Sequence, residues 1–152
     1  MKNAYGYPQL ILRLALGIGF ALPVLDRLGL LGAPGTKGVN WGTWAKFIDY
    51  TNVILPIVNR PIANVLGIFV TICEAVFGIC LILGFKTRVM AYGSALLTLI
   101  FGFCMAVFLG IHSPFGYPVF VFTGGGLLLS CVEKFNWSID NLTSRKRERI
   151  LS

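Results

Sequence analysis

The stretch that decides the fold runs from residue 62 to residue 111 and reads IANVLGIFVTICEAVFGICLILGFKTRVMAYGSALLTLIFGFCMAVFLGI. It holds two apolar runs, residues 62–85 and 89–111, separated by the short polar turn Lys86-Thr87-Arg88. An α-helix needs about 20 apolar residues to cross a hydrocarbon layer of ~30 Å. Both runs meet that length, so the stretch predicts two antiparallel membrane helices joined by a tight turn.

Two further apolar segments flank this hairpin, at residues 9–31 and 115–132. The first contains Arg13 and, near its end, Asp26 and Arg27, whereas the second contains no charged residue. Because Arg13 interrupts the apolar core of the first segment, we expect a retained helix rather than a secretory signal peptide. The sequence therefore predicts an all-α fold, an integral membrane four-helix bundle formed as one domain.

The composition agrees with a membrane protein. Hydrophobic residues make up 56% of the 152 residues and charged residues only 12%, against about 25% in soluble domains. Too few polar side chains remain to cover a soluble globule, and the chain is too apolar for a disordered protein. Both classes are therefore excluded.

The net charge of +7 raises the question of nucleic acid. Four of the basic residues lie close together near the C-terminus: Arg145, Lys146, Arg147 and Arg149. Since no aromatic residues are interleaved with them, they lack the stacking surface with which proteins hold single-stranded nucleic acid. We predict contact with the lipid bilayer, through anionic lipid, and no nucleic-acid partner.

The basic residues also predict the orientation. Lys86 and Arg88 in the hairpin turn lie on the same side as a basic tail at residues 133–152, in a four-span topology. Basic residues on the other side are spread along the loop at residues 32–61. Because short cytoplasmic segments carry an excess of Lys and Arg, we predict that both termini are cytoplasmic.

The loop at residues 32–61 is too long to be a mere connection. Within it, Trp44, Phe47 and Ile48 have the spacing of one helix face, and Lys46 lies off that face. Such a segment is typical of an amphipathic helix in the membrane interface, with its aromatic rings at head-group depth. It would serve either as an interface anchor or as a lid over a pocket at the outer face.

Small residues recur at helical spacing in three of the predicted spans and allow close contact between helices in lipid. They are Gly17 and Ala21 after Arg13; Gly67, Thr71 and Gly78 around Glu74; and Ser94, Thr98, Gly102, Ala106 and Gly110 in the third span. This pattern predicts that Arg13 and Glu74 face other protein rather than lipid.

Glu74 is the most informative residue, because a charge near the bilayer centre costs at least ~2.5 kcal/mol on insertion scales. Three interpretations remain open from the sequence. Glu74 is protonated in its apolar surroundings; or it forms a buried ion pair with Arg13; or it handles protons or anchors a ligand.

At the outer face, His112 is the only histidine and ends the third span. It serves either as an interface hydrogen-bonding group or as a ligand or proton group for a molecule bound there. Asp26, Arg27 and Arg60 are predicted to lie on the same side, where they could form a charged cluster. The sequence has no CxxC pair or other metal-ligand spacing, so no metal site is predicted.

Several marks together resemble the DoxX/DoxD family of small four-helix bacterial membrane proteins. They are Arg13 and Gly17 in the first span, the string Glu74-x-x-x-Gly78 … Leu83-Gly84-x-x-Thr87-Arg88 in the hairpin, and Ser138-Ile139-Asp140 after the fourth span. The chain departs from the family at the end of the first span. Members often carry a His-Gly-x-x-Lys-like segment there, where this chain has Pro23-Val-Leu-Asp26-Arg27-Leu-Gly29.

This resemblance implies a multi-pass protein of the bacterial inner (cytoplasmic) membrane. DoxD-type members resemble subunits of thiosulfate:quinone oxidoreductase, so it further implies an accessory subunit of a quinone-linked electron-transfer complex, without a redox centre of its own. Arg13, Glu74 and Arg88 would lie near a quinone or lipid pocket, with His112 as a further candidate at the outer end. The alternative is a purely structural subunit at the periphery of a larger respiratory or photosynthetic membrane complex.

Overall fold

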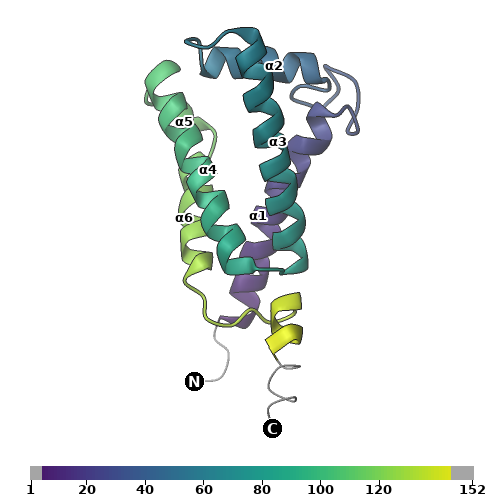
Figure 1. Ribbon diagram of the computed structural model, residues 1–152, viewed down its shortest axis with the longest axis vertical. Helices are drawn as coiled ribbons and strands as arrows, with labels where there is room; N and C mark the ends of the chain where they lie inside the picture. The colour runs from purple at the N-terminus through teal and green to yellow at the C-terminus, as the bar shows by residue number, and fades with distance from the viewer. Residues whose placement is uncertain (1–4, 145–152) are drawn as a thin grey trace.

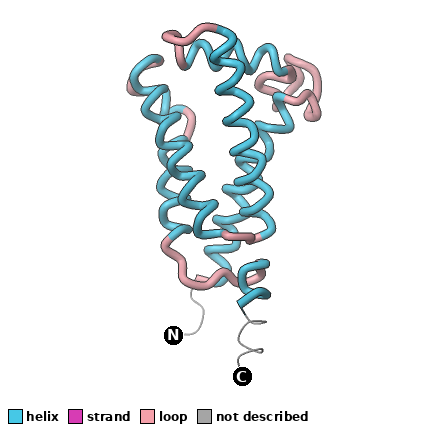
Figure 2. Tube along the Cα trace, in the orientation of Figure 1, coloured by secondary structure: helices cyan, strands magenta, loops and turns pink. Residues whose placement is uncertain are grey.

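The computed structural model describes residues 5–144. Its labelled helices are α1 (Gly6–Arg27), α2 (Trp44–Ile54), α3 (Arg60–Leu83), α4 (Thr87–Phe108), α5 (Ser113–Gly116) and α6 (Val119–Ser130), and residues 139–144 are helical as well. No strand occurs within the described range (Figure 2), which confirms the all-α prediction. The predicted basic cluster that begins at Arg145 lies outside the described residues.

Three helices are long and apolar enough to cross a membrane: α1, α3 and α4, with 22, 24 and 22 residues. At 1.5 Å per residue, each is about 33 to 36 Å long. They correspond to the first three predicted spans. However, α1 ends at Arg27 rather than near residue 31, because Gly29 adopts a positive φ of 76° and turns the chain into the loop.

The fourth predicted span, residues 115–132, is divided in the structure. The single turn α5 ends at Gly116, and α6 contains only 12 residues. Pro118 stands at the boundary as the N-cap of α6. Because proline has no N–H to donate, a helix running through α5 into α6 would lack a hydrogen bond at this point.

The long helices form two closely packed pairs, α1 with α3 and α4 with α6, as Figure 1 shows. Glycines allow both contacts. A Cβ atom on Gly78 would lie 3.1 Å from the carbonyl oxygen of Gly17 in α1, and one on Gly126 would lie 2.9 Å from that of Ala91 in α4. The predicted contact of small residues is therefore present at Gly17 and Gly78, and Gly126 makes a second close backbone contact that the pattern did not predict.

Helices α1, α3, α4 and α6 meet around one cluster of buried apolar residues. It contains Leu16 and Phe20 of α1, Leu81 of α3 and Leu129 of α6. The ring of Phe20 makes edge contacts with rings on α3 and α6. The cluster joins the two pairs, and α4 and α6 are also linked by a buried hydrogen bond between the hydroxyls of Thr98 and Thr123 at 2.9 Å.

One end of the bundle, here called the α2 end, is crossed by α2 (Figure 1). Phe47 and Ile48 are buried against α3 beside Gly67, while Lys46 is exposed. The predicted amphipathic helix is therefore confirmed. The opposite end, called the turn end, holds the α3–α4 turn, the first turn of α1 and the segment that follows α6.

Candidate functional site

The four site residues predicted from the sequence do not come together. Glu74 lies within α3, Arg13 lies towards the turn end, and His112 precedes α5 at the α2 end. Arg88 is exposed at the turn end, where its Nη2 donates to the carbonyl oxygen of Val132 at 3.1 Å. The exposed His112 makes no side-chain hydrogen bond within the described residues.

The partner of Glu74 is Arg27, at the end of α1. Arg27 Nη2 lies 2.6 Å from Glu74 Oε2, and Nη1 donates to the hydroxyl of Thr71 at 2.8 Å. The Nε atom donates to the carbonyl oxygen of Pro23 at 3.0 Å, so the side chain runs back along its own helix. The alternative pairing of Glu74 with Arg13 is therefore wrong, although both residues are buried as predicted.

Two aromatic rings cover this ion pair from the α2 end. The guanidinium carbon of Arg27 lies 3.9 Å from the ring centre of Phe47 and 5.4 Å from that of Trp41. The side chains of Arg27 and Glu74 are only 2% and 8% exposed. Because the cation contacts an anion, a hydroxyl and two π faces, the pair is enclosed, and it fixes the register of α1 against α3.

Asp26, the neighbour of Arg27, holds the loop that leads into α2. Its carboxylate accepts hydrogen bonds from the backbone N–H groups of Asn40 and Gly42, both at 2.8 Å, and of Trp41 at 3.3 Å. Arg60 does not join these residues. It forms an exposed ion pair with Asp49 at 2.7 Å, so the predicted cluster of Asp26, Arg27 and Arg60 is not formed.

At the turn end, Asp140 holds the α3–α4 turn together. Its carboxylate oxygens accept hydrogen bonds from the backbone N–H groups of Lys86 and Thr87, both at 2.8 Å, at the start of α4. Its own N–H donates to the carbonyl oxygen of Gly84, the C-cap of α3, at 3.0 Å. One residue therefore caps the end of one helix and the beginning of the next.

Two buried polar side chains of α1 hold the segment just before Asp140. Arg13 Nη2 donates to the carbonyl oxygen of Trp137 at 2.7 Å, and Gln9 Nε2 donates to that of Asn136 at 3.1 Å. The Nε atom of Arg13 and the Oε1 atom of Gln9 are buried without a hydrogen-bond partner in the described chain. Arg13 thus positions a segment that begins more than 120 residues later in the sequence.

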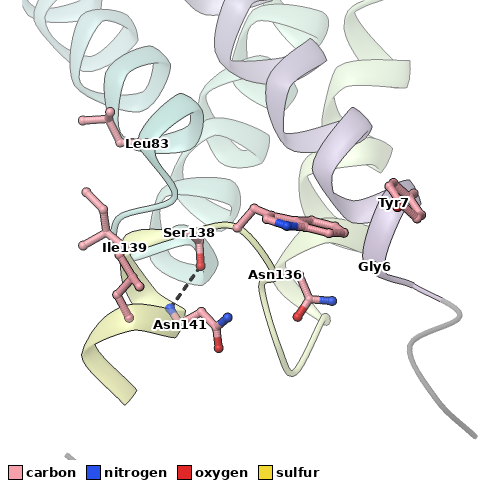
Figure 3. A pocket seen from close by; sticks show the side chains of 9 residues that line it. Gly6, Tyr7, Leu83, Asn136, Ser138, Ile139 and Asn141 are labelled. Atoms are coloured by element: carbon pink, nitrogen blue, oxygen red, sulfur yellow. Dashed lines mark hydrogen bonds between the residues drawn. The ribbon is translucent and has the colours of Figure 1, made fainter. Parts of the chain in front are cut away.

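Beside this segment lies a groove of about 620 Å³, here called the turn-end groove. Figure 3 shows Tyr7 on α1 and Leu83 at the end of α3 on either side of the segment with Asn136 and Asn141. The rings of Tyr7 and Trp137 are 5.1 Å apart and tilted. The lining residues are Gly6, Tyr7, Leu83, Asn136, Trp137, Ser138, Ile139, Asn141 and Leu142.

The groove combines exposed aromatic rings with free amide groups. The side-chain amides of Asn136 and Asn141 make no hydrogen bond within residues 5–144, whereas the backbone N–H of Asn141 donates to Ser138 Oγ at 3.1 Å. A flat ligand with carbonyl acceptors fits such a groove, because the rings offer stacking surfaces and the amides offer donors. Within the same range, no group of three or more His, Cys, Asp or Glu residues that could hold a metal ion is present.

Comparison with protein families identifies the chain. The model of the DoxX family matches residues 9–109. The chain belongs to the DoxX family. The resemblance on the sequence marks is thereby confirmed, and the apolar helices make this DoxX protein a membrane protein. The searches of curated proteins and of solved structures gave no match.

The matched residues run from the first turns of α1 to the end of α4. Arg13, Glu74 and Arg88 lie within this DoxX region, whereas His112 and Asp140 lie beyond it. The sequence did not predict Arg27 as the partner of Glu74, nor Tyr7, Trp137 and Asn136 at the groove. For these last three residues, the signal was their aromatic or amide character just outside the first and fourth apolar segments.

Proposed function

We propose that this DoxX-family protein is an accessory membrane subunit of a quinone-linked electron-transfer complex, without a redox centre of its own. In this proposal the turn-end groove holds the quinone head group. The observation that carries it is the groove of about 620 Å³ where the Tyr7–Trp137 ring pair lies beside the amides of Asn136 and Asn141.

The turn-end groove suits the chemistry of a quinone better than the surroundings of Glu74 do. A quinone ring is flat and apolar and carries two carbonyl acceptors, which suit aromatic rings and amide donors. The Arg27–Glu74 pair is buried beneath the ring of Phe47, and the guanidinium of Arg27 is already engaged with the carboxylate. A bound quinone would supply electron acceptance, while Arg13 acts as a positioning residue through its hydrogen bond to the Trp137 carbonyl oxygen.

We further propose that the turn end faces the cytoplasm of a bacterial cell, with α5 and α6 together making a fourth crossing. Lys86, Arg88 and Lys134 lie at the turn end, and the basic cluster from Arg145 follows in the sequence. An excess of Lys and Arg in short cytoplasmic segments supports this orientation. Both termini would then be cytoplasmic.

Fluorescence quenching tests the quinone proposal. The purified protein in lipid nanodiscs is titrated with a short-chain benzoquinone, and tryptophan emission is recorded. We expect saturable quenching that is lost in the Trp137→Phe variant and weakened about thirtyfold in Asn136→Ala/Asn141→Ala, the loss of two hydrogen bonds of about 1 kcal/mol each.

Asn40→Ala is the matched control, because Asn40 meets Asp26 only through its backbone N–H. It should bind the quinone like the wild type. Quenching that does not saturate, or that survives unchanged in Trp137→Phe, would contradict a quinone in this groove.

The structural alternative is favoured by the enclosed ion pair and by the wide apolar surface of the long helices. Val65, Val107 and Val121 are more than 60% exposed on three different helices, so lipid or other subunits must cover these faces. Deletion of the gene discriminates the two functions. A partner complex that keeps its quinone turnover but loses stability would favour the structural role.

A further inference from the structure

A second groove, here called the α2–α3 groove, lies at the α2 end and is independent of the quinone proposal. Its volume is about 350 Å³, and its lining residues are Trp44, Ala45, Ile48, Arg60, Pro61 and Asn64. It lies between α2 and the first turns of α3, where α2 crosses the end of the bundle (Figure 1).

The polar groups of this groove are arranged to accept an anion. Asn64 Oδ1 accepts a hydrogen bond from the indole Nε1 of Trp44 at 2.8 Å, which leaves the amide Nδ2 group without a partner in the described chain. Arg60 lines the same groove and is 63% exposed. Its ion pair with Asp49, itself 57% exposed, contributes little, so the guanidinium can turn to a ligand.

The apolar side of the groove continues along the lipid-facing surface of α3. Pro61 lines the groove, and Val65, Phe69 and Ile72 follow at helical spacing with exposures of 65%, 62% and 58%. An acyl chain along this surface would begin beside Arg60 and Asn64. The ligand therefore needs both an anionic head and a hydrocarbon tail.

We propose that the α2–α3 groove binds an anionic phospholipid. The phosphate accepts hydrogen bonds from Arg60 and from Asn64 Nδ2, the head group packs against Trp44, and one acyl chain lies along α3. Arg60 is the one charged residue among those that line the groove, and it makes the groove's rim positive. This rim favours phosphatidylglycerol over a zwitterionic lipid.

Native mass spectrometry of the full chain, stripped of lipid in detergent, tests the proposal. Phosphatidylglycerol and phosphatidylcholine with identical chains are titrated in parallel, and inorganic phosphate is added to the preformed lipid complex. We expect phosphatidylglycerol to bind about tenfold more tightly than phosphatidylcholine. A tenfold molar excess of inorganic phosphate should not displace it, because the ion lacks the acyl contacts.

One set of variants should weaken the binding of phosphatidylglycerol, and another should strengthen it. Arg60→Gln and Asn64→Asp should each abolish the preference for phosphatidylglycerol, since Asn64→Asp keeps the oxygen that Trp44 needs but replaces the donor. Asp49→Asn should strengthen binding several-fold, because it releases Arg60. Lys37→Gln, the loss of an exposed charge in the same loop, is the control and should leave binding unchanged.

Three results would overturn the proposal: equal binding of the two lipids by the wild type, an equal loss in Lys37→Gln and Arg60→Gln, or displacement of the lipid by a tenfold molar excess of inorganic phosphate. Helicity measured by circular dichroism establishes that Asn64→Asp is folded. Arg60→Gln changes only an exposed pair and gives the decisive comparison if Asn64→Asp unfolds.

Discussion

The ion pair of Glu74 and Arg27 gives the sharpest prediction for single residues. Glu74→Gln leaves the guanidinium of Arg27 buried opposite a neutral group, at a cost of about 3–5 kcal/mol. We expect a large fall in the thermal midpoint of the purified protein and a lower protein level in the membrane. Lys37→Gln removes an exposed charge that makes no side-chain contact of this kind within the described residues and should leave both quantities unchanged.

The double variant Arg27→Gln/Glu74→Gln separates charge from packing. Two facing amides can hydrogen-bond without a buried charge, so the double variant should be more stable than Glu74→Gln alone. Thermal unfolding of the set measures the coupling between the two positions. Additive losses would mean that the two residues do not stabilise the fold as a pair.

This pair also shows where prediction from one sequence stops. The burial of Glu74 followed from its position among small residues on one helix face, which is a local pattern. The identity of its partner depends on the antiparallel register of α1 against α3. That register involves both the contact of Gly17 with Gly78 and the ion pair itself, and the pattern of small residues within each helix does not say which residues of the two helices meet.

At the scale of elements, the contact between α1 and α3 should fail when a side chain enters it. A Cβ atom on Gly78 would lie 3.1 Å from the Gly17 carbonyl oxygen and 3.2 Å from the backbone nitrogen of Ala21. Gly78→Ala must therefore push two backbones apart, at about 1–3 kcal/mol. Thermal unfolding should show a lower midpoint.

Gly124 of α6 provides the matched control, because a Cβ atom there meets nothing within 4 Å. Gly124→Ala should be neutral or slightly stabilising, since alanine is the better helix former by about 1 kcal/mol. Equal losses in the two alanine variants would show that close helix contact is not the reason for the glycine at position 78.

The junction of α3 and α4 depends on Asp140 in the same way. Asp140→Ala leaves the N–H groups of Lys86 and Thr87 without their acceptors, and caps of this kind contribute about 1–2 kcal/mol. We expect faster hydrogen exchange at these two amides and a lower thermal midpoint. Glu133→Ala, an exposed acid at the same end, should show neither effect; protected amides in Asp140→Ala would refute the capping role.

Elements were predicted well where hydropathy alone decides them. The three long spans follow from apolar length, and α2 follows from the spacing of Trp44, Phe47 and Ile48. The division between α5 and α6 was missed, because the apolar run continues through Pro118. A hydropathy value does not reflect that proline lacks a backbone N–H. The role of Asp140 was missed as well, because its two partners lie more than 50 residues earlier.

At the scale of the whole molecule, the length of α6 bears on the fourth crossing that we propose. With 12 residues, α6 is about 18 Å long, shorter than a hydrocarbon layer of ~30 Å. Yet Asp140 after α6 bonds to Lys86 in the α3–α4 turn, so the two segments must lie on the same side. If α4 crosses the layer from this turn, the chain must return to the same side, and the fourth crossing that we propose through α5 and α6 requires the bilayer to thin locally around them.

Labelling from one side of the membrane tests this topology. In a background with the native cysteines replaced, Lys37→Cys lies in the loop before α2 and Lys134→Cys lies after α6. We expect an impermeant maleimide to modify Lys37→Cys in intact cells and Lys134→Cys only after permeabilisation. Modification of both in intact cells would mean that α6 does not cross the membrane. That result would be incompatible with the hydrogen bond between Asp140 and Lys86, which requires the two segments to lie on the same side.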